Sequence, residues 1–445
     1  MKKEKILLKN GTLVSSEGSF EKDLLIENGK IVKSGNVGGA RVIDCKGKMI
    51  LPGLIDVHVH FREPGANYKE DWTTGSSAAV AGGVTTVCDM PNNTPPTTSV
   101  ENLEKKRALI KGRSYCNYGL YIGYDGKNLN EIKKAKNIAG VKVYVANSTG
   151  NMGVSNEALK KLFKEFEGRI VTHAEDEGMI EKNSKEFLAE FENREIDPAV
   201  HSKIRSVESA ESAVKLVCGL AKKSKAKLHV AHVSCDAEVE VIAKHKKFGV
   251  TCEVAPHHLL LSDDDYSICK NFIKVNPPVR SRLDVFSMWK NLKFGVIDMI
   301  ATDHAPHTIE EKEQSYEKAP SGVPELDTLL PIFLNTVNDE GMTIEELVGY
   351  LCEKPAQIFG IKNKGFLKEG YDADIVVVDM DIEKKVERAN LFSKCGWSPY
   401  EGSNFKGWPV MTFVGGELVF EEGKIVGEKV GREVEFGLTK SEVLI

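Results

Sequence analysis

The sequence has 445 residues, in which 60 Lys and Arg stand against 65 Asp and Glu, so its net charge is −5. No block of like charge is long enough to bind a polyanion and no apolar stretch reaches the ~20 residues of a membrane span, so we expect neither nucleic acid nor a membrane as a partner. With 41% hydrophobic residues the composition is that of a globular protein, which excludes a mostly disordered chain.

Both ends of the chain contain short β-type runs separated by tight turns. In residues 1–53 the runs are divided by Asn-Gly and Lys-Gly pairs, and in residues 361–445 a Gly-Gly pair divides two further runs. Because the two ends share this pattern, we predict that they combine into one small β-sandwich domain.

The middle of the chain, residues 54–360, alternates short apolar β-rich runs with longer amphipathic segments, which is typical of repeated βα units. It contains eight candidate strands, at 54–60, 84–90, 118–124, 139–146, 169–175, 227–233, 250–256 and 297–303. Eight parallel strands are enough to close a barrel. We therefore predict an α/β fold, a TIM-type (β/α)8 barrel with the β-sandwich domain beside it.

Polar side chains lie in or at the C-terminal ends of these candidate strands, where barrel enzymes build their active sites. His58 and His60 alternate within one strand, so their imidazoles point the same way. His173, His232 and Asp303 come from three other strands. Each of these residues alone is more often structural than functional. Together, four imidazoles and one carboxylate from four strand ends favour a metal site of the kind that suits zinc.

Lys142 is unusual because it stands inside an apolar run, GVKVYV at 140–145. In one interpretation its stem lies along the barrel and its ammonium reaches solvent. In the other, burial lowers its pKa, the neutral amine takes up carbon dioxide, and the resulting carbamate bridges two cations. The sequence leaves both interpretations open.

Arg62 lies two residues beyond the His-x-His pair and is expected on the same side of the chain, where a guanidinium can bind a substrate carboxylate bidentately. Asn92 lies on the next rim loop and offers that carboxylate a second hydrogen bond, although an asparagine there is by default a turn residue. Asn276 and His307 are further candidates at the rim. Residues 304–330 are charged and then rich in Gly and Pro, which predicts either a rim loop that covers the substrate or a solvated connector.

The nine cysteines are scattered through apolar runs and include no Cys-x-x-Cys pair, and the N-terminus offers no signal-peptide core. We therefore expect reduced, buried thiols in a cytoplasmic protein.

Three motifs carry a resemblance to a known family. They are DVHVHFREPG at 56–65, DMPN at 89–92, and ATDHAPH at 301–307 with Lys312 following. On these motifs the chain resembles the dihydroorotases of the amidohydrolase superfamily, and the similarity extends over nearly its whole length. The His-x-His strand alone would indicate only the superfamily.

This resemblance implies a binuclear metal centre with two zinc ions. The lysine is carboxylated in similar enzymes, and it then bridges the two ions. The implied ligands are His58, His60 and Asp303 for one ion, His173 and His232 for the other, and N6-carboxylysine at Lys142 for both.

The implied reaction is the reversible hydrolysis of (S)-dihydroorotate to N-carbamoyl-L-aspartate in pyrimidine (UMP) biosynthesis, by a metal-bridged hydroxide. Asp303 is the implied catalytic residue, which takes the hydroxide proton and delivers it to the leaving nitrogen. Arg62, Asn92 and His307 match the residues that bind the substrate carboxylate. Asn276 matches a position that contacts the substrate ring.

Two alternatives stay open. An allantoinase or a hydantoinase or dihydropyrimidinase belongs to the same superfamily, but hydantoin-type substrates need carry no carboxylate, so Arg62 argues against it. A metal-free structural homologue would be a scaffold rather than an enzyme, and the presence of every expected ligand argues against it. The resemblance also implies a homodimer, and some relatives associate with aspartate carbamoyltransferase; no sequence feature supports either partner.

Overall fold

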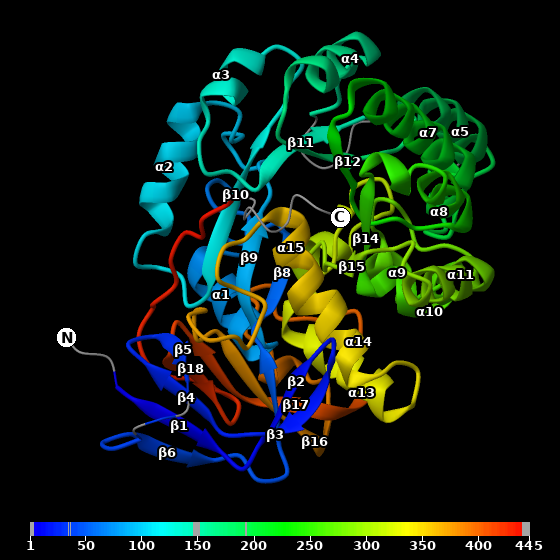
Figure 1. Ribbon diagram of the computed structural model, residues 1–445. Helices are drawn as coiled ribbons and strands as arrows, with labels where there is room; N and C mark the ends of the chain where they lie inside the picture. The colour runs from blue at the N-terminus through cyan, green and yellow to red at the C-terminus, as the bar shows by residue number, and fades with distance from the viewer. Residues whose placement is uncertain (1–3, 34, 36, 146–151, 192–193, 438–445) are drawn as a thin grey trace.

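The computed structural model describes residues 4–33, 35, 37–145, 152–191 and 194–437. Their strands form three sheets: an eight-stranded parallel sheet that curls into a barrel, and a four-stranded and a seven-stranded sheet made from the two ends of the chain. The blue N-terminal strands and the red and orange C-terminal strands lie together beside the barrel (Figure 1). Within the described ranges, no helix has the length and apolar character needed to cross a bilayer.

The two smaller sheets bring the ends of the chain together. The four-stranded sheet has the order β5-β4-β1-β6, with bounds Lys30–Val32, Leu24–Glu27, Ile6–Lys9 and Arg41–Asp44. The seven-stranded sheet has the order β19-β18-β17-β16-β7-β2-β3, with bounds Lys424–Ile425, Glu417–Glu421, Asn404–Val414, Ile375–Lys385, Met49–Pro52, Thr12–Ser15 and Gly18–Glu21. Strand β16 pairs antiparallel with both β7 and β17, so an N-terminal and a C-terminal strand flank it. The predicted β unit is thus confirmed, while the exact domain boundaries at 53 and 360 stay a prediction.

The barrel strands follow one another in chain order, each parallel to the next. They are β8 (Leu54–Val59), β9 (Val84–Asp89), β10 (Asn117–Gly123), β11 (Gly140–Tyr144), β12 (Arg169–His173), β13 (Lys227–Val230), β14 (Thr251–Val254) and β15 (Met299–Ile300). A parallel bridge between Val59 and His304 links the end of the series to its beginning. Every residue of β8, β9 and β10 is buried, as expected for parallel strands covered on both faces. The predicted (β/α)8 barrel is confirmed.

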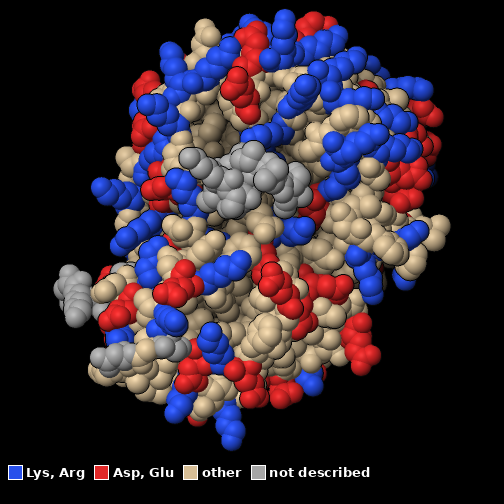
Figure 2. All heavy atoms as spheres, in the orientation of Figure 1, with Lys and Arg blue, Asp and Glu red and all other residues tan. Residues whose placement is uncertain are grey.

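Helices cover the outside of the barrel (Figure 1). They are α1 (Trp72–Ala81), α2 (Val100–Ile110), α3 (Leu129–Lys134), α4 (Asn156–Glu165), α5 (Glu177–Ala189), α6 (Val200–Ile204), α7 (Val207–Ser224), α8 (Asp236–Ala243), α9 (Pro256–Leu260), α10 (Tyr266–Cys269), α11 (Arg282–Lys293), α12 (Ile309–Lys312), α13 (Leu329–Asn338), α14 (Ile344–Val348) and α15 (Lys354–Phe359). The short helical segments are η1 (Lys246–Phe248), η2 (Asp263–Asp265), η3 (Lys270–Ile273), η4 (Leu326–Thr328), η5 (Gly349–Glu353) and η6 (Arg388–Asn390). The outer face shown in Figure 2 carries Lys, Arg, Asp and Glu side chains interspersed.

The last barrel strand is much shorter than its predicted range of 297–303. Strand β15 covers only Met299–Ile300, and the chain then leaves the sheet. Asp303 has a left-handed backbone with φ of 51°, which is incompatible with an extended strand. The sharp turn directs the carboxylate of Asp303 into the open end of the barrel.

Candidate active site

The predicted site residues meet at the C-terminal ends of the barrel strands. One pocket there contains every predicted site residue in its wall except His307. Its other wall residues are Tyr144, Ala305, Ser321 and Gly322. The cavity volume is about 30 Å³, so the polar groups that line it lie close together.

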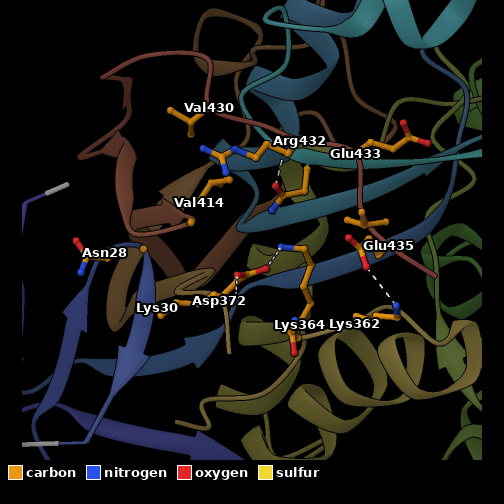
Figure 3. A pocket seen from close by; sticks show the side chains of 15 residues that line it. Asn28, Lys30, Lys362, Lys364, Asp372, Val414, Val430, Arg432, Glu433 and Glu435 are labelled. Carbon is orange, nitrogen blue, oxygen red and sulfur yellow. Dashed lines mark hydrogen bonds and ion pairs between the residues drawn. The ribbon is translucent and has the colours of Figure 1, made fainter. Parts of the chain in front are cut away.

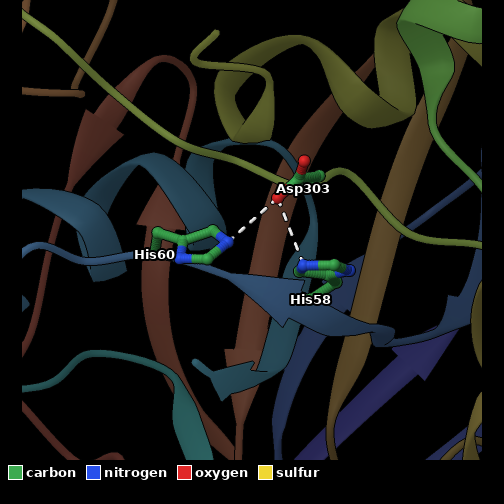
Figure 4. A group of neighbouring side chains, drawn as sticks. All are labelled: His58, His60 and Asp303. Carbon is green, nitrogen blue, oxygen red and sulfur yellow. Dashed lines mark hydrogen bonds and ion pairs between the residues drawn. The ribbon is translucent and has the colours of Figure 1, made fainter. Parts of the chain in front are cut away.

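His58, His60 and Asp303 form the tightest group in this pocket (Figure 4). Their ligand atoms all lie within 4.8 Å of one another. Oδ1 of Asp303 is 3.2 Å from Nε2 of His58 and 3.0 Å from Nε2 of His60. The two imidazoles come from the end of β8 and point the same way, as their spacing predicted, while the carboxylate comes from the chain after β15.

Hydrogen bonds decide which imidazole nitrogens carry lone pairs. Nδ1 of His60 is 2.7 Å from Oδ1 of Asn92, and Nδ1 of His58 contacts the Glu253 carboxylate, so both Nδ1 atoms donate. Both Nε2 atoms therefore direct lone pairs at the Asp303 carboxylate. Burial lowers the pKa of His60 to about 4, which keeps that ring neutral near pH 7. Three acceptors that converge in this way are chemically suited to hold a cation.

Lys142 lies beside this group and is fully buried in β11. Its Nζ is 3.5 Å from Nε2 of His58. The interpretation in which the ammonium reaches solvent is therefore wrong. Burial lowers the pKa of Lys142 to about 8, which raises the fraction of neutral amine that can react with carbon dioxide. The carbamate itself stays a prediction.

His173 and His232 form a second pair, and the ring of His232 lies 5.2 Å from the ring of His58. Nδ1 of His173 is 3.1 Å from Nε2 of His232. Nε2 of His173 donates to Glu175 at 2.8 Å, so its Nδ1 holds a lone pair that faces His232. Burial is the main cause that lowers the pKa of both rings, and neutral imidazoles are the form that binds metals.

Carboxylates behind the imidazoles were not among the predicted site residues. Glu253 contacts Nδ1 of His58 with one oxygen and lies 3.0 Å from Nε2 of His229 with the other, and all three side chains are buried. Glu175 likewise joins His173 to Arg205. Such partners fix the tautomer and orientation of metal-binding histidines. One sequence feature could have indicated these carboxylates: each is an ionisable residue inside an apolar β-type run, the same feature that drew attention to Lys142.

The predicted substrate-binding residues lie in the pocket wall or beside it. The guanidinium of Arg62 is buried, with Nε donating to the Pro306 carbonyl at 3.0 Å and Nη2 3.0 Å from Nε2 of His307. His307 is thus beside Arg62, although it lies outside the pocket wall. Asn92 accepts a hydrogen bond from His60, so it contacts a predicted metal ligand. Oδ1 of Asn276 is 2.9 Å from Nε2 of His201, another buried imidazole that the sequence did not single out.

The rim segment after Asp303 is packed against the pocket. Ser321 and Gly322 belong to the wall, so this part of the segment does border the predicted substrate site. Lys312 is buried at the end of α12, and its Nζ donates to three backbone carbonyls, of Lys274 (3.2 Å), Pro320 (3.0 Å) and Gly322 (3.0 Å). A solvated connector is therefore the wrong description of this part of the segment.

Three site residues have left-handed backbones, which non-glycine residues rarely adopt. They are Arg62 with φ of 61°, His232 with φ of 36° and Asp303 with φ of 51°. Such conformations persist only where surrounding contacts fix them, and they gather at functional sites. Each lies just past a barrel strand and turns its side chain toward the pocket.

A larger cavity, of about 280 Å³, lies between the opposite end of the barrel and the smaller sheets (Figure 3). Lys364 ion-pairs there with Asp372 at 3.0 Å and with Asp374 at 2.5 Å. Asn117, the first residue of β10, also donates to Asp374 at 3.0 Å. These polar groups satisfy one another, and the N-terminal end of a barrel serves stability rather than chemistry. The smaller pocket is therefore the candidate active site.

Comparisons with known proteins agree with the motifs. The sequence pattern of the amidohydrolase family matches residues 49–419. The chain is 39% identical over 430 residues to a dihydroorotase of Bacillus cytotoxicus, covering 94% of this chain and 98% of the relative. It is 36% identical over 446 residues to a dihydroorotase of Methanosarcina acetivorans, covering 96% and 94%. Among solved structures, the L-hydantoinase (dihydropyrimidinase) from Arthrobacter aurescens matches with a TM-score of 0.92 at 34% identity, covering 98% of this chain and 100% of that one. These likenesses confirm the resemblance.

Proposed function

Since the chain belongs to the amidohydrolase family, we propose that it is a dihydroorotase, a hydrolase of cyclic amides that interconverts (S)-dihydroorotate and N-carbamoyl-L-aspartate in pyrimidine synthesis. Arg62 is the observation that carries this choice. Its guanidinium is buried at the pocket wall and bonds to a carbonyl and an imidazole, and among the described residues no carboxylate forms an ion pair with it. A buried cation needs an anionic partner, which the carboxylate of dihydroorotate supplies.

We propose two zinc ions in the pocket, with Lys142 carboxylated between them. The converging Nε2 and Oδ1 atoms of His58, His60 and Asp303 support one position, and the facing nitrogens of His173 and His232 support the other. The imidazole and carboxylate donors suit zinc. When bound, the metals would polarise the substrate carbonyl and lower the pKa of a water molecule.

The protein's own residues then orient the substrate and move protons. Arg62 and the adjacent His307 would fix the substrate carboxylate, which places the amide bond near Asp303. The carboxylate of Asp303 would accept the proton of the attacking water and deliver it to the leaving ring nitrogen.

A hydantoinase or dihydropyrimidinase is the second candidate, favoured by the close structural match to the L-hydantoinase from Arthrobacter aurescens. Hydrolysis of dihydroorotate, allantoin, hydantoin and dihydrouracil, each with and without a chelator, separates the candidates. We expect dihydroorotate to have the highest kcat/KM and the chelator to abolish turnover. An Arg62→Ala protein that still hydrolyses dihydroorotate at the rate of the unmodified protein would count against the assignment.

Three further properties are proposed with the function. A cytoplasmic location follows from the scattered cysteines, and a homodimeric state and an association with aspartate carbamoyltransferase follow from the resemblance. Light scattering of the purified protein, alone and mixed with that enzyme, tests the two associations.

A further inference from the structure

Tyr144 lies in the wall of the active-site pocket, and the described residues offer its hydroxyl no hydrogen-bond partner. It is the last residue of β11, two positions after Lys142, so both side chains point to the same side of the sheet. The residue is 4% exposed. Among the described residues, its hydroxyl has no hydrogen-bond partner. A buried hydroxyl without a partner loses free energy, so its presence in a pocket needs a reason.

Most other buried tyrosines satisfy their hydroxyl within the protein. Tyr121 donates to the Val57 carbonyl at 2.8 Å, and Tyr400 bonds to Glu325. Tyr266 lies near Ser202 and does not line the pocket. Tyr144 alone among these combines an unpartnered hydroxyl with a place in the active-site wall.

Tyr144 lies close both to predicted metal ligands and to the predicted carboxylate clamp at Arg62. Nζ of Lys142 lies 5.3 Å from the centre of its ring, and the ring of His173 lies 5.8 Å away. Asp303 and Arg62 are both near enough to shift the pKa of Tyr144, Asp303 upward and Arg62 downward, although burial is the main cause that raises it. The hydroxyl is a donor placed between the predicted metal ligands and the predicted carboxylate clamp.

We propose that the hydroxyl of Tyr144 donates a hydrogen bond to an oxygen of the bound cyclic amide, which makes Tyr144 a substrate-binding residue. This inference rests on the proposed function, because it takes the pocket to be the substrate site. Dihydroorotate offers two groups that suit this donor: its carboxylate, and the amide carbonyl under attack, whose oxygen gains negative charge. A hydrogen bond to either group stabilises its negative charge.

Tyr144→Phe tests this role because it removes the hydroxyl and keeps the ring. We expect kcat/KM for dihydroorotate to fall about 10- to 100-fold, the size expected when a hydrogen bond to a charged group is lost. The melting temperature of the substrate-free protein should stay the same or rise, because the hydroxyl has no partner there to lose. Tyr350→Phe is the matched control, since its hydroxyl donates to the Leu292 carbonyl at 2.9 Å outside the pocket. The control should lower the melting temperature and leave kcat/KM unchanged.

The kinetic constants identify the oxygen. A rise in KM with unchanged kcat indicates the carboxylate, and a fall in kcat indicates the amide oxygen. If Tyr144→Phe keeps both constants within twofold of the unmodified protein, the inference is wrong. It is also wrong if the melting temperature falls as much as in the control, because the hydroxyl then has a structural partner. If the unmodified protein prefers hydantoin or dihydrouracil, the proposed function fails, and the same comparison made with that substrate still decides the role of Tyr144.

Discussion

Replacing Lys312 by methionine removes an ammonium that ties three backbone carbonyls together at the rim of the pocket. The methionine keeps the apolar length of the side chain, so the change acts mainly on hydrogen bonds. Each bond from a charged donor contributes about 1.5–3 kcal/mol, and three are lost. The gain from no longer burying a charge offsets part of this, because burial costs several kcal/mol for each ion. We expect the free energy of unfolding to fall by about 3 kcal/mol, the difference between these two opposing contributions.

Urea unfolding followed by tryptophan fluorescence measures this loss. Lys105→Met is the matched control: its exposed ammonium pairs with Glu101 at 2.6 Å on α2, and such a surface pair contributes about 0.5 kcal/mol. Because Ser321 and Gly322 form part of the pocket wall, Lys312→Met should also raise KM for dihydroorotate by more than it lowers kcat. The control should leave both constants unchanged.

A loss below about 1 kcal/mol, the ordinary effect of a point mutation, would refute this account. It would mean that water or a shift of the backbone satisfies the three carbonyls after the ammonium is gone. An unchanged KM together with a large loss of stability would separate the two effects and leave Lys312 with a structural role only.

Four other outcomes are expected. Glu253→Gln should lower the affinity for zinc about 10- to 100-fold, because an amide does not fix the His58 imidazole as the Glu253 carboxylate does. The control Glu240→Gln changes an exposed carboxylate and should leave the affinity for zinc unchanged. Metal analysis after dialysis measures both. Arg62→Lys should lower kcat/KM for dihydroorotate about 100-fold, since an ammonium cannot replace a bidentate guanidinium, and steady-state kinetics would contradict this if KM stayed the same. Chelation followed by two equivalents of zinc per chain should abolish and then restore turnover, and failure of zinc to restore it would argue against the proposed metal. At pH 8 the folded protein should react slowly with a thiol reagent, and Cys269 should react first because the other cysteines are buried. Burial also raises the pKa of a buried thiol such as Cys116, to about 12, so little reactive thiolate forms. Rapid reaction of two or more thiols would contradict the structure.

The sequence was sufficient to predict the barrel because each strand can be recognised from its own residues. Apolar β-rich runs alternate with amphipathic segments, and eight of them fill the region between the two β-rich ends. The polar residues of these runs stand at the C-terminal ends, which parallel strands bring to one side. The grouping of His58, His60 and Asp303 follows from that arrangement, although 243 positions separate the last two.

The supporting contacts could not be predicted in the same way. Glu253 on β14 contacts His58 on β8 past the strand between them, β15, and a sequence pattern does not say which residues on different strands share a height in the interior. The role of Lys312 depends on three carbonyls from two separate segments, and backbone carbonyls leave no trace in the sequence. The length of β15 was wrong for a related reason, since the left-handed turn at Asp303 is imposed by its surroundings rather than by its residue type.

The sequence by itself therefore determined the order of elements, the barrel, and the kinds of donor at its open end, because hydrophobic periodicity and residue chemistry are local properties. Only the tertiary structure decided which nitrogen of each imidazole faces its neighbours, that Lys142 is cut off from solvent, and that Arg62 is buried without a carboxylate partner among the described residues. These facts depend on distances between residues far apart in the chain, which exist only after the barrel has closed.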